Sequence, residues 1–237
     1  MAIAFDAATD GGAGGSPLTF SHTCSGENRI LFVACVDDTG GSSLITGITY
    51  AGVAMTKIAG VQTPTDRWVT LWYLIAPATG ANNVVITLSG GMVYAAAASY
   101  TGAKQSGVPD AYTSNTASNA PSITCTLTTI ADNCWLVGSF KMVYGTTPSS
   151  GANTYQRLTA DYNRGLLDSN GAQTPAGSKS MSLSKNNQWW GMVMASFAPY
   201  VVSGPANLKS LNTNLKANIK SYNTNLIANV KSINTNV

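Results

Sequence analysis

The stretch PLTFSHTCSGENRILFVACV, residues 17–36, decides the fold class of this chain. Its two arms, residues 17–24 and 28–36, are rich in β-branched and aromatic residues, and the polar segment SGEN separates them. Apolar runs of this length bounded by Gly, Asn and Ser are typical of β-strands. We therefore expect two strands here, and the short segment at residues 25–28 predicts a hairpin turn between them.

Runs of the same kind continue along the next 160 residues, and helical periodicity is absent among them. They are ITGITYAG (45–52), RWVTLWYLI (67–75), NNVVITLS (82–89), MVYAAAASY (92–100), PSITCTLTT (121–129), NCWLVGSFKMV (133–143), SKSMSLS (178–184) and QWWGMVMASF (188–197). Short strands separated by Gly, Pro, Asn and Ser turns predict an all-β fold, namely a jelly-roll-like β-sandwich.

The sequence also indicates one pattern used twice. A shift of 105 places LTFSHTCSGENRILF over ITCTLTTIADNCWLV, and a shift of 97 places YAAAASY over GMVMASF. A hairpin opens each half, and a strand of small residues ending in Ser and an aromatic residue closes it. We expect a single β-sandwich over residues 1–198, with pseudo-repeated halves at about 1–110 and 111–198, rather than two independent domains.

Charged residues are scarce in this sequence. Charged residues are 10% of the 237 residues, against about 25% in an average protein. The surface is therefore polar through hydroxyl and amide groups, which suits extracellular and virion proteins. Residues 1–200 contain nine Lys and Arg against ten Asp and Glu, and the remaining residues add four lysines. Four spaced lysines do not form a nucleic-acid-binding arm, so no nucleic-acid partner is expected.

The first residues, MAIAFDAATDGG, show neither a basic nor an apolar segment of a secretory signal. No apolar run approaches the ~18 residues of a membrane-spanning helix. The four cysteines (Cys24, Cys35, Cys125 and Cys134) are widely spaced, without a C-x-x-C motif. In the expected hairpins, Cys24 does not meet Cys35, and Cys125 does not meet Cys134. We therefore expect buried free thiols and no zinc.

No catalytic centre is predicted. The only histidine, His22, lies in an expected strand, and no nucleophile motif such as G-x-S-x-G accompanies it. Asp37 and Asp38 precede a Thr-Gly-Gly segment, but the calcium-loop pattern is missing. We expect no enzyme activity, cofactor or metal.

The tryptophans offer two interpretations. Trp72 lies in one expected strand, and Trp189 and Trp190 lie in another. Aromatic side chains of this size usually fill a core, but outward tryptophans stack on sugar rings, so Trp72 and Trp190 are candidate glycan contacts. Because neighbouring strand residues face opposite sides, one of Trp189 and Trp190 should face outward or a neighbouring subunit.

After a Pro- and Gly-containing linker at residues 199–207, the spacing of the apolar residues changes. The phrases LKSLNTN, IKSYNTN and VKSINTN begin 11 residues apart, and the apolar spacing of 3, 4 and 4 residues is that of one helical face. An 11-residue repeat favours a right-handed coiled coil. Asn, Ser and Thr fill 15 of the 31 positions from Asn207 onward, each costing up to ~0.7 kcal/mol relative to Ala in a helix.

A helix this weak needs partners, so residues 208–237 predict an assembly tail, with a disordered tail as the alternative. The candidate interface residues are Leu208, Leu211, Leu215, Ile219, Tyr222, Leu226, Val230, Ile233 and Val237.

The runs NRILFVACV, VTLWYLIAPATGANNVVITLSG and AAAASYTGAKQSGVPDA resemble a β-sandwich of bacterial surface and bacteriophage proteins. The Lys-Ser-x-Asn repeats resemble the C-terminal ends of bacteriophage structural proteins. The resemblance implies a virion component made in the host cytoplasm: a capsid decoration protein, head fibre or tail fibre, with no catalytic residues.

The expected partners are sister chains, as a homo-oligomer and by analogy a trimer, and other virion proteins. The alternative function is a carbohydrate-binding or adhesive module that contacts a host-surface glycan.

Overall fold

The computed structural model describes residues 1–38, 41–143, 147–160 and 163–201. All regular secondary structure in these ranges consists of β-strands. This confirms the all-β class. Residues Met1–Tyr200 form one compact unit, here called the body. The linker from residue 202 onward and the expected helical tail at 208–237 lie outside the described residues.

Sheet I lies in the middle of the body and has the order β1-β9-β3-β7-β6. Its strands are β1 (Ala4–Gly14), β9 (Val93–Thr101), β3 (Ile30–Asp38), β7 (Arg67–Ile75) and β6 (Thr56–Gln62). Both faces of β3 and β9 are buried, which explains why these strands read as continuous apolar runs instead of alternating ones. Four consecutive alanines of β9, Ala95–Ala98, are buried, two on each face of sheet I.

Sheet II covers one face of sheet I and has the order β2-β8-β4-β5. Its strands are β2 (Leu18–Cys24), β8 (Gly80–Leu88), β4 (Ile45–Tyr50) and β5 (Val53–Ala54). Buried and exposed residues alternate along β2 and β8, as expected for a sheet with one face in solvent.

Sheet III covers the other face of sheet I and has the order β10-β15-β11-β14-β13, with β12 paired to β15. Its strands are β10 (Ala111–Thr129), β15 (Gly177–Phe197), β11 (Trp135–Met142), β14 (Arg164–Asp168), β13 (Tyr155–Ala160) and β12 (Ser149–Ser150). The pairing of β10 with β15 changes register near Ala117 and Ala120. Beyond that point the pair folds back over its own sheet, as a segment that we call the returning arm (residues 120–129 and 177–188).

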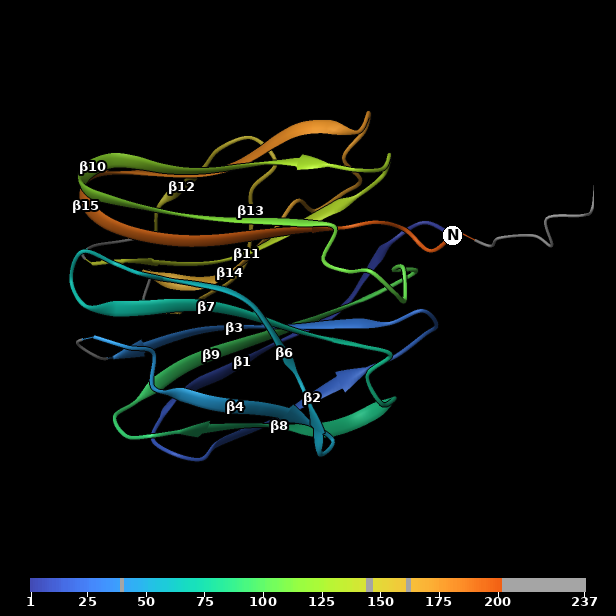
Figure 1. Ribbon diagram of the computed structural model, residues 1–237, viewed down its shortest axis with the longest axis horizontal. Coiled ribbons are helices and arrows are strands. Elements are labelled where there is room, and N and C mark those ends of the chain that lie inside the picture. Colours follow the sequence, from blue (N-terminus) through green and yellow to red (C-terminus); the bar gives the residue numbers. More distant parts are fainter. Residues whose placement is uncertain (39–40, 144–146, 161–162, 202–237) are drawn as a thin grey trace, which may run out of the picture. The chain divides into compact units, whose positions relative to one another are not determined.

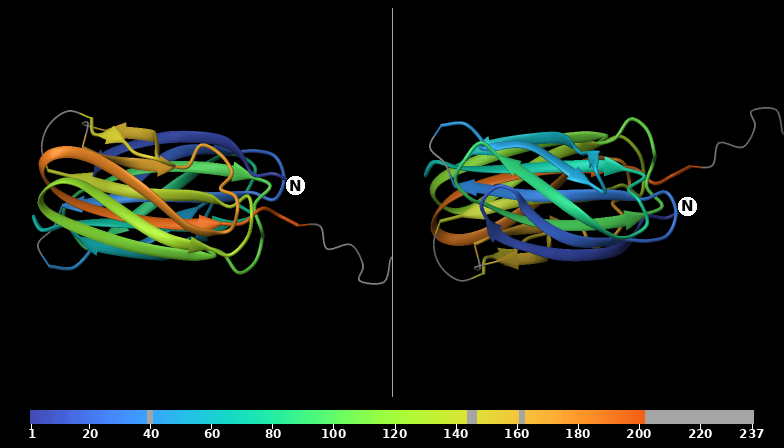
Figure 2. Two further views of the ribbon diagram at one scale, coloured as in Figure 1. Left: turned by 90° about the horizontal axis from the view of Figure 1, so that it is seen from above. Right: turned by 90° about the horizontal axis from the view of Figure 1, so that it is seen from below.

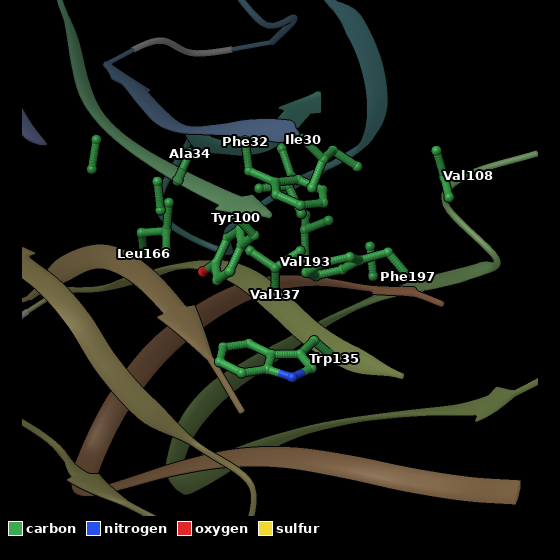
Figure 3. Packing of buried hydrophobic residues seen from close by; sticks show 14 of the residues in the cluster. Ile30, Phe32, Ala34, Tyr100, Val108, Trp135, Val137, Leu166, Val193 and Phe197 are labelled. Atoms are coloured by element: carbon green, nitrogen blue, oxygen red, sulfur yellow. The ribbon is translucent and has the colours of Figure 1, made fainter. Parts of the chain in front are cut away.

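Three hydrophobic cores separate these layers, which lie one above another in Figure 1. One lies between sheets II and I, one between sheets I and III, and one between sheet III and the returning arm. In the core between sheets I and III, the rings of Phe32 and Tyr100 meet those of Trp135 and Phe197 (Figure 3), with centroid separations of 5.1–5.5 Å. Figure 2 shows the strands of the stacked sheets running along the same long axis.

The strand pairings of residues 1–101 and 111–197 correspond. In the first half, β1 pairs with β9 in sheet I, and β2 pairs with β8 in sheet II. In the second half, the two long strands β10 and β15 pair along their whole length and correspond to both of these pairs. Leu31 pairs with Ser99 on β9, and Leu136 pairs with Ser196 on β15. The first half is divided into separate strands because GGSP (14–17) and SGGM (89–92) interrupt it.

The predicted hairpin at residues 25–28 is wrong, and so is the hairpin expected to open the second half near residues 131–133, because β10 and β11 do not pair with each other. β2 pairs with β8 in sheet II, whereas β3 pairs with β7 and β9 in sheet I. The chain therefore crosses from one layer to the next at this turn. The physical reason is that β3 is buried on both faces and needs two neighbouring strands within sheet I, while β2 has one solvent face.

Candidate functional site

His22 on β2 lies in a buried hydrogen-bond network with residues of β1 and β9. Its Nε2 is 3.1 Å from Ser99 Oγ, and its Nδ1 is 2.9 Å from Thr9 Oγ1. The Ser99 hydroxyl donates to Asp6 Oδ2 at 2.7 Å, and the Ser25 N–H donates to the same oxygen at 2.8 Å. The network joins sheet II to sheet I at one edge of the body.

The proton on Ser99 sets the directions of these hydrogen bonds. Because the hydroxyl donates to Asp6, it accepts from His22 Nε2–H, and Nδ1 then accepts from Thr9. Burial lowers the pKa of His22 to about 4, against the attraction of Asp6. Burial alone would raise the pKa of Asp6, but hydrogen bonds from Ser25 and Ser99 lower it overall. At neutral pH a neutral imidazole therefore lies beside an ionised carboxylate.

This arrangement does not activate Ser99 as a nucleophile. In a Ser-His-Asp triad the hydroxyl gives its proton to the imidazole, and the carboxylate orients the imidazole. Here the hydroxyl lies between the other two groups and directs its proton to Asp6. The exposed fraction of Ser99 is 0%, so no substrate reaches it. The network links β1, β2 and β9, and its imidazole and the Ser99 hydroxyl are both buried.

A second buried network joins the two halves of the body. Arg157 on β13 binds Asp168 on β14 through two hydrogen bonds, of 2.7 and 3.0 Å, and Tyr100 on β9 donates to the same carboxylate at 2.8 Å. The guanidinium also lies 4.0 Å from the ring centre of Phe5 and 4.5 Å from that of Tyr155. Sequence reasoning missed this cluster, whose only signal is an arginine and an aspartate within apolar strands.

Asp37 and Asp38 do not share a ligand. As neighbours at the end of β3 they face opposite sides of sheet I. Asp37 Oδ2 accepts from the Ser43 hydroxyl at 2.6 Å and from the Leu44 N–H at 3.0 Å, whereas Asp38 pairs with Arg67. Burial raises the pKa of Asp37. Nowhere in the described ranges do three or more His, Cys, Asp or Glu side chains gather as a metal site.

The two tryptophans proposed as glycan contacts are buried, so that assignment is corrected. Trp72 is 8% exposed and its indole N–H donates to Thr70, while Trp190 is 0% exposed and donates to the carbonyl of Ala120. Neither ring face is open to a sugar. Trp189, on the opposite side of β15, is partly exposed.

All four cysteines are buried and free. Burial raises the pKa of Cys125 to about 12, and it also raises the pKa values of the other three thiols. A thiol in this state is a poor nucleophile and a poor metal ligand. The predicted buried thiols are confirmed, although the hairpins from which they were argued do not form.

The chain leaves the body at a fixed point. The Tyr200 N–H donates to the carbonyl of Gly102 at 2.7 Å, and the amino group of Met1 donates to the carbonyl of Tyr200 at 2.9 Å. Ala103 and Pro199 form an isolated bridge beside them. Figure 1 shows residue 1 and the orange segment near residue 200 at the same end of the body. The nine candidate interface residues of the tail lie outside the described residues.

The chain matches no protein-family model, no curated protein and no solved structure in the comparisons made. In the part of the chain that the structure describes, no helix has the length and apolarity to cross a membrane.

Proposed function

We propose that this protein is a non-enzymatic structural and assembly protein, in which a rigid β-body is carried on a C-terminal assembly tail. The observation that carries the proposal is the tail sequence, whose apolar residues recur with a spacing of 3, 4 and 4 from Leu208 to Val237. Such a stripe on a helix of low intrinsic stability requires a partner surface. We further propose that sister tails pair as a right-handed helical coiled coil, with three chains in the assembly.

The body supports this proposal in two ways. In its Ser-His-Asp cluster Ser99 and His22 are buried and the Ser99 proton is directed to Asp6, and its thiols are buried as well. The last residues of the body are held by Met1 and Gly102, so a tail that follows Tyr200 begins from a defined position. A body whose last residues are held in place is suited to display on a particle.

We place the protein in a virus-like particle, as a capsid decoration protein, head fibre or tail fibre with a jelly-roll-like body. The support is the resemblance of the runs quoted above and the charge-poor surface. A glycan-binding function is not proposed, because Trp72 and Trp190 are buried.

Light scattering of the purified full chain tests the assembly. The full chain should have the mass of an oligomer, and a chain ending at Tyr200 should be a monomer. Replacing two stripe residues, Ile219→Asp with Val230→Asp, should also give monomers, because buried carboxylates oppose helix pairing. Asn218→Asp with Asn229→Asp adds the same charge beside the stripe and should leave the mass unchanged. A monomeric full chain would disprove self-assembly.

Antibodies against the body test the placement on a particle. They should label the surface of intact particles in electron micrographs of the producing culture. Labelling confined to free protein would contradict a virion role without affecting the result on self-assembly.

A further inference from the structure

Basic side chains gather between sheets I and III, at the end of the body opposite the chain's exit point. Arg67 begins β7, Lys141 lies near the end of β11, and Arg164 begins β14. Each lies two or four positions from a residue of the core between these sheets, and side chains two apart on a strand share a face. Those core residues are Val69, Val137 and Leu166. The three basic groups therefore face the same interlayer space.

A cavity of about 190 Å³ lies beside two of these side chains, Arg67 and Lys141, and we call it the basic cavity. It is lined by Thr65, Arg67, Lys141 and Val143, so both halves of the body contribute to it. At ~30 Å³ per water molecule, its volume suits a small ion with a few waters and is too small for a polymer chain. Binding sites commonly occur where two structural units meet.

The third basic side chain, Arg164, lines a second cavity of about 80 Å³. Its lining includes Asp38, Tyr94 and Arg164, and the Arg164 guanidinium lies 4.8 Å from the ring centre of Tyr94. Lys141 and Arg164 are paired residues on β11 and β14, so their backbones lie side by side. Among the described residues that line the two cavities, Asp38 is the one carboxylate.

Asp38, which lines the second cavity, forms an ion pair with Arg67 of the basic cavity. Its Oδ1 lies 2.9 Å from Arg67 Nε, and both side chains are partly exposed. An exposed ion pair of this kind contributes little stability, ~0–1 kcal/mol. It is therefore readily exchanged for a better ligand of the guanidinium.

We propose that the basic cavity binds a small oxyanion, a phosphate, sulfate or carboxylate group. The Arg67 guanidinium presents paired donors that match two oxygens of such a group. The Lys141 ammonium and the Thr65 hydroxyl supply further donors. Lys141 is 8% exposed, and charge interactions are stronger in such a dehydrated environment than in water. Asp38 then acts as an internal competitor that occupies Arg67 in the absence of the ligand.

Isothermal titration of the full chain with inorganic phosphate and with sulfate, against chloride at equal ionic strength, tests the proposal. Saturable binding should be weakened roughly tenfold or more by Lys141→Met or Arg67→Gln, since each removes a charged donor. Asp38→Asn should instead tighten binding, because it removes the competitor. Lys179→Met removes a lysine from the returning arm, which lines neither cavity, and should leave binding unchanged.

A parallel titration with glucuronic acid distinguishes an inorganic ion from the acid group of a sugar as the source. Preference for phosphate or sulfate supports a free inorganic ion, and preference for glucuronate supports an acidic glycan. Each variant's melting temperature shows whether it folds, and the partly exposed Arg67 provides a second variant if the Lys141 variant does not fold. Absence of saturable binding, equal binding by the Arg67 and Lys141 variants and the parent, or weaker binding by Asp38→Asn would overturn the proposal.

Discussion

His22 illustrates how one buried side chain ties stability to pH. Its pKa is about 4 in the folded protein and ~6.5 in an unfolded chain. The unfolded state therefore binds more protons between these values, and stability falls as pH decreases through this window. The full effect is about 3 kcal/mol, present above pH ~6.5 and lost by pH ~4.

Urea unfolding at pH 7 and at pH 4.5 should show this loss in the parent protein. The same comparison in His22→Gln should give a smaller difference, because the variant has no imidazole to protonate. An equal pH dependence in both proteins would contradict the assignment and place the effect on carboxylates such as Asp6.

Arg157 carries a second prediction at the scale of single residues. Arg157→Met would leave the Asp168 carboxylate, which is 0% exposed, without its ion-pair partner. Breaking a buried pair from one side typically costs ~3–5 kcal/mol. Tyr100→Phe removes only one hydrogen bond to the same carboxylate and should cost less, about 1.5–3 kcal/mol.

Chemical denaturation of the two variants checks this order. The double variant Arg157→Met with Asp168→Leu should recover part of the loss, since no unpaired charge remains. A double variant that is less stable than Arg157→Met would contradict the assignment of the loss to the unpaired Asp168 charge.

At the scale of elements, the strands were predictable and their partners were not. Apolar runs at residues 28–36 and 92–100 correspond to β3 and β9, because a strand buried on both faces must be apolar throughout. The run at residues 67–75 corresponds to β7. The turn at residues 25–28 has the composition of a hairpin turn, yet it connects two layers. Turn composition specifies a local change of direction, whereas the choice of sheet depends on burial over the whole strand.

The buried networks show the same limit at the level of side chains. His22 was expected in a strand and outside any catalytic centre, but its hydrogen-bond partner Ser99, and Asp6 beyond it, could not be predicted because they lie on other strands. Alternation along β15 placed Trp189 and Trp190 on opposite faces without showing which face was buried. The returning arm buries Trp190, and it exists because β10 and β15 are long enough to fold over their own sheet.

At the scale of the whole body, the halves share a core and should unfold together. The core between sheets I and III takes Phe32 and Tyr100 from one half and Trp135 and Phe197 from the other. Either half alone would expose this apolar face to water, where each large side chain loses ~1.5–3 kcal/mol of burial. The Arg157–Asp168–Tyr100 network would also be broken. We therefore expect one cooperative transition for residues 1–200.

Phe140→Ala tests this coupling, because Phe140 lies in the core between sheet III and the returning arm, away from the first half. The truncation should cost ~3–5 kcal/mol. If the body unfolds as one unit, global unfolding governs the slowest-exchanging amides of β8 in sheet II, and their protection should fall by the same free energy. Ile130→Ala, at an exposed site, is the control and should change little. Unchanged protection of β8 in Phe140→Ala would mean that the halves unfold independently, with the shared core contributing little to their coupling.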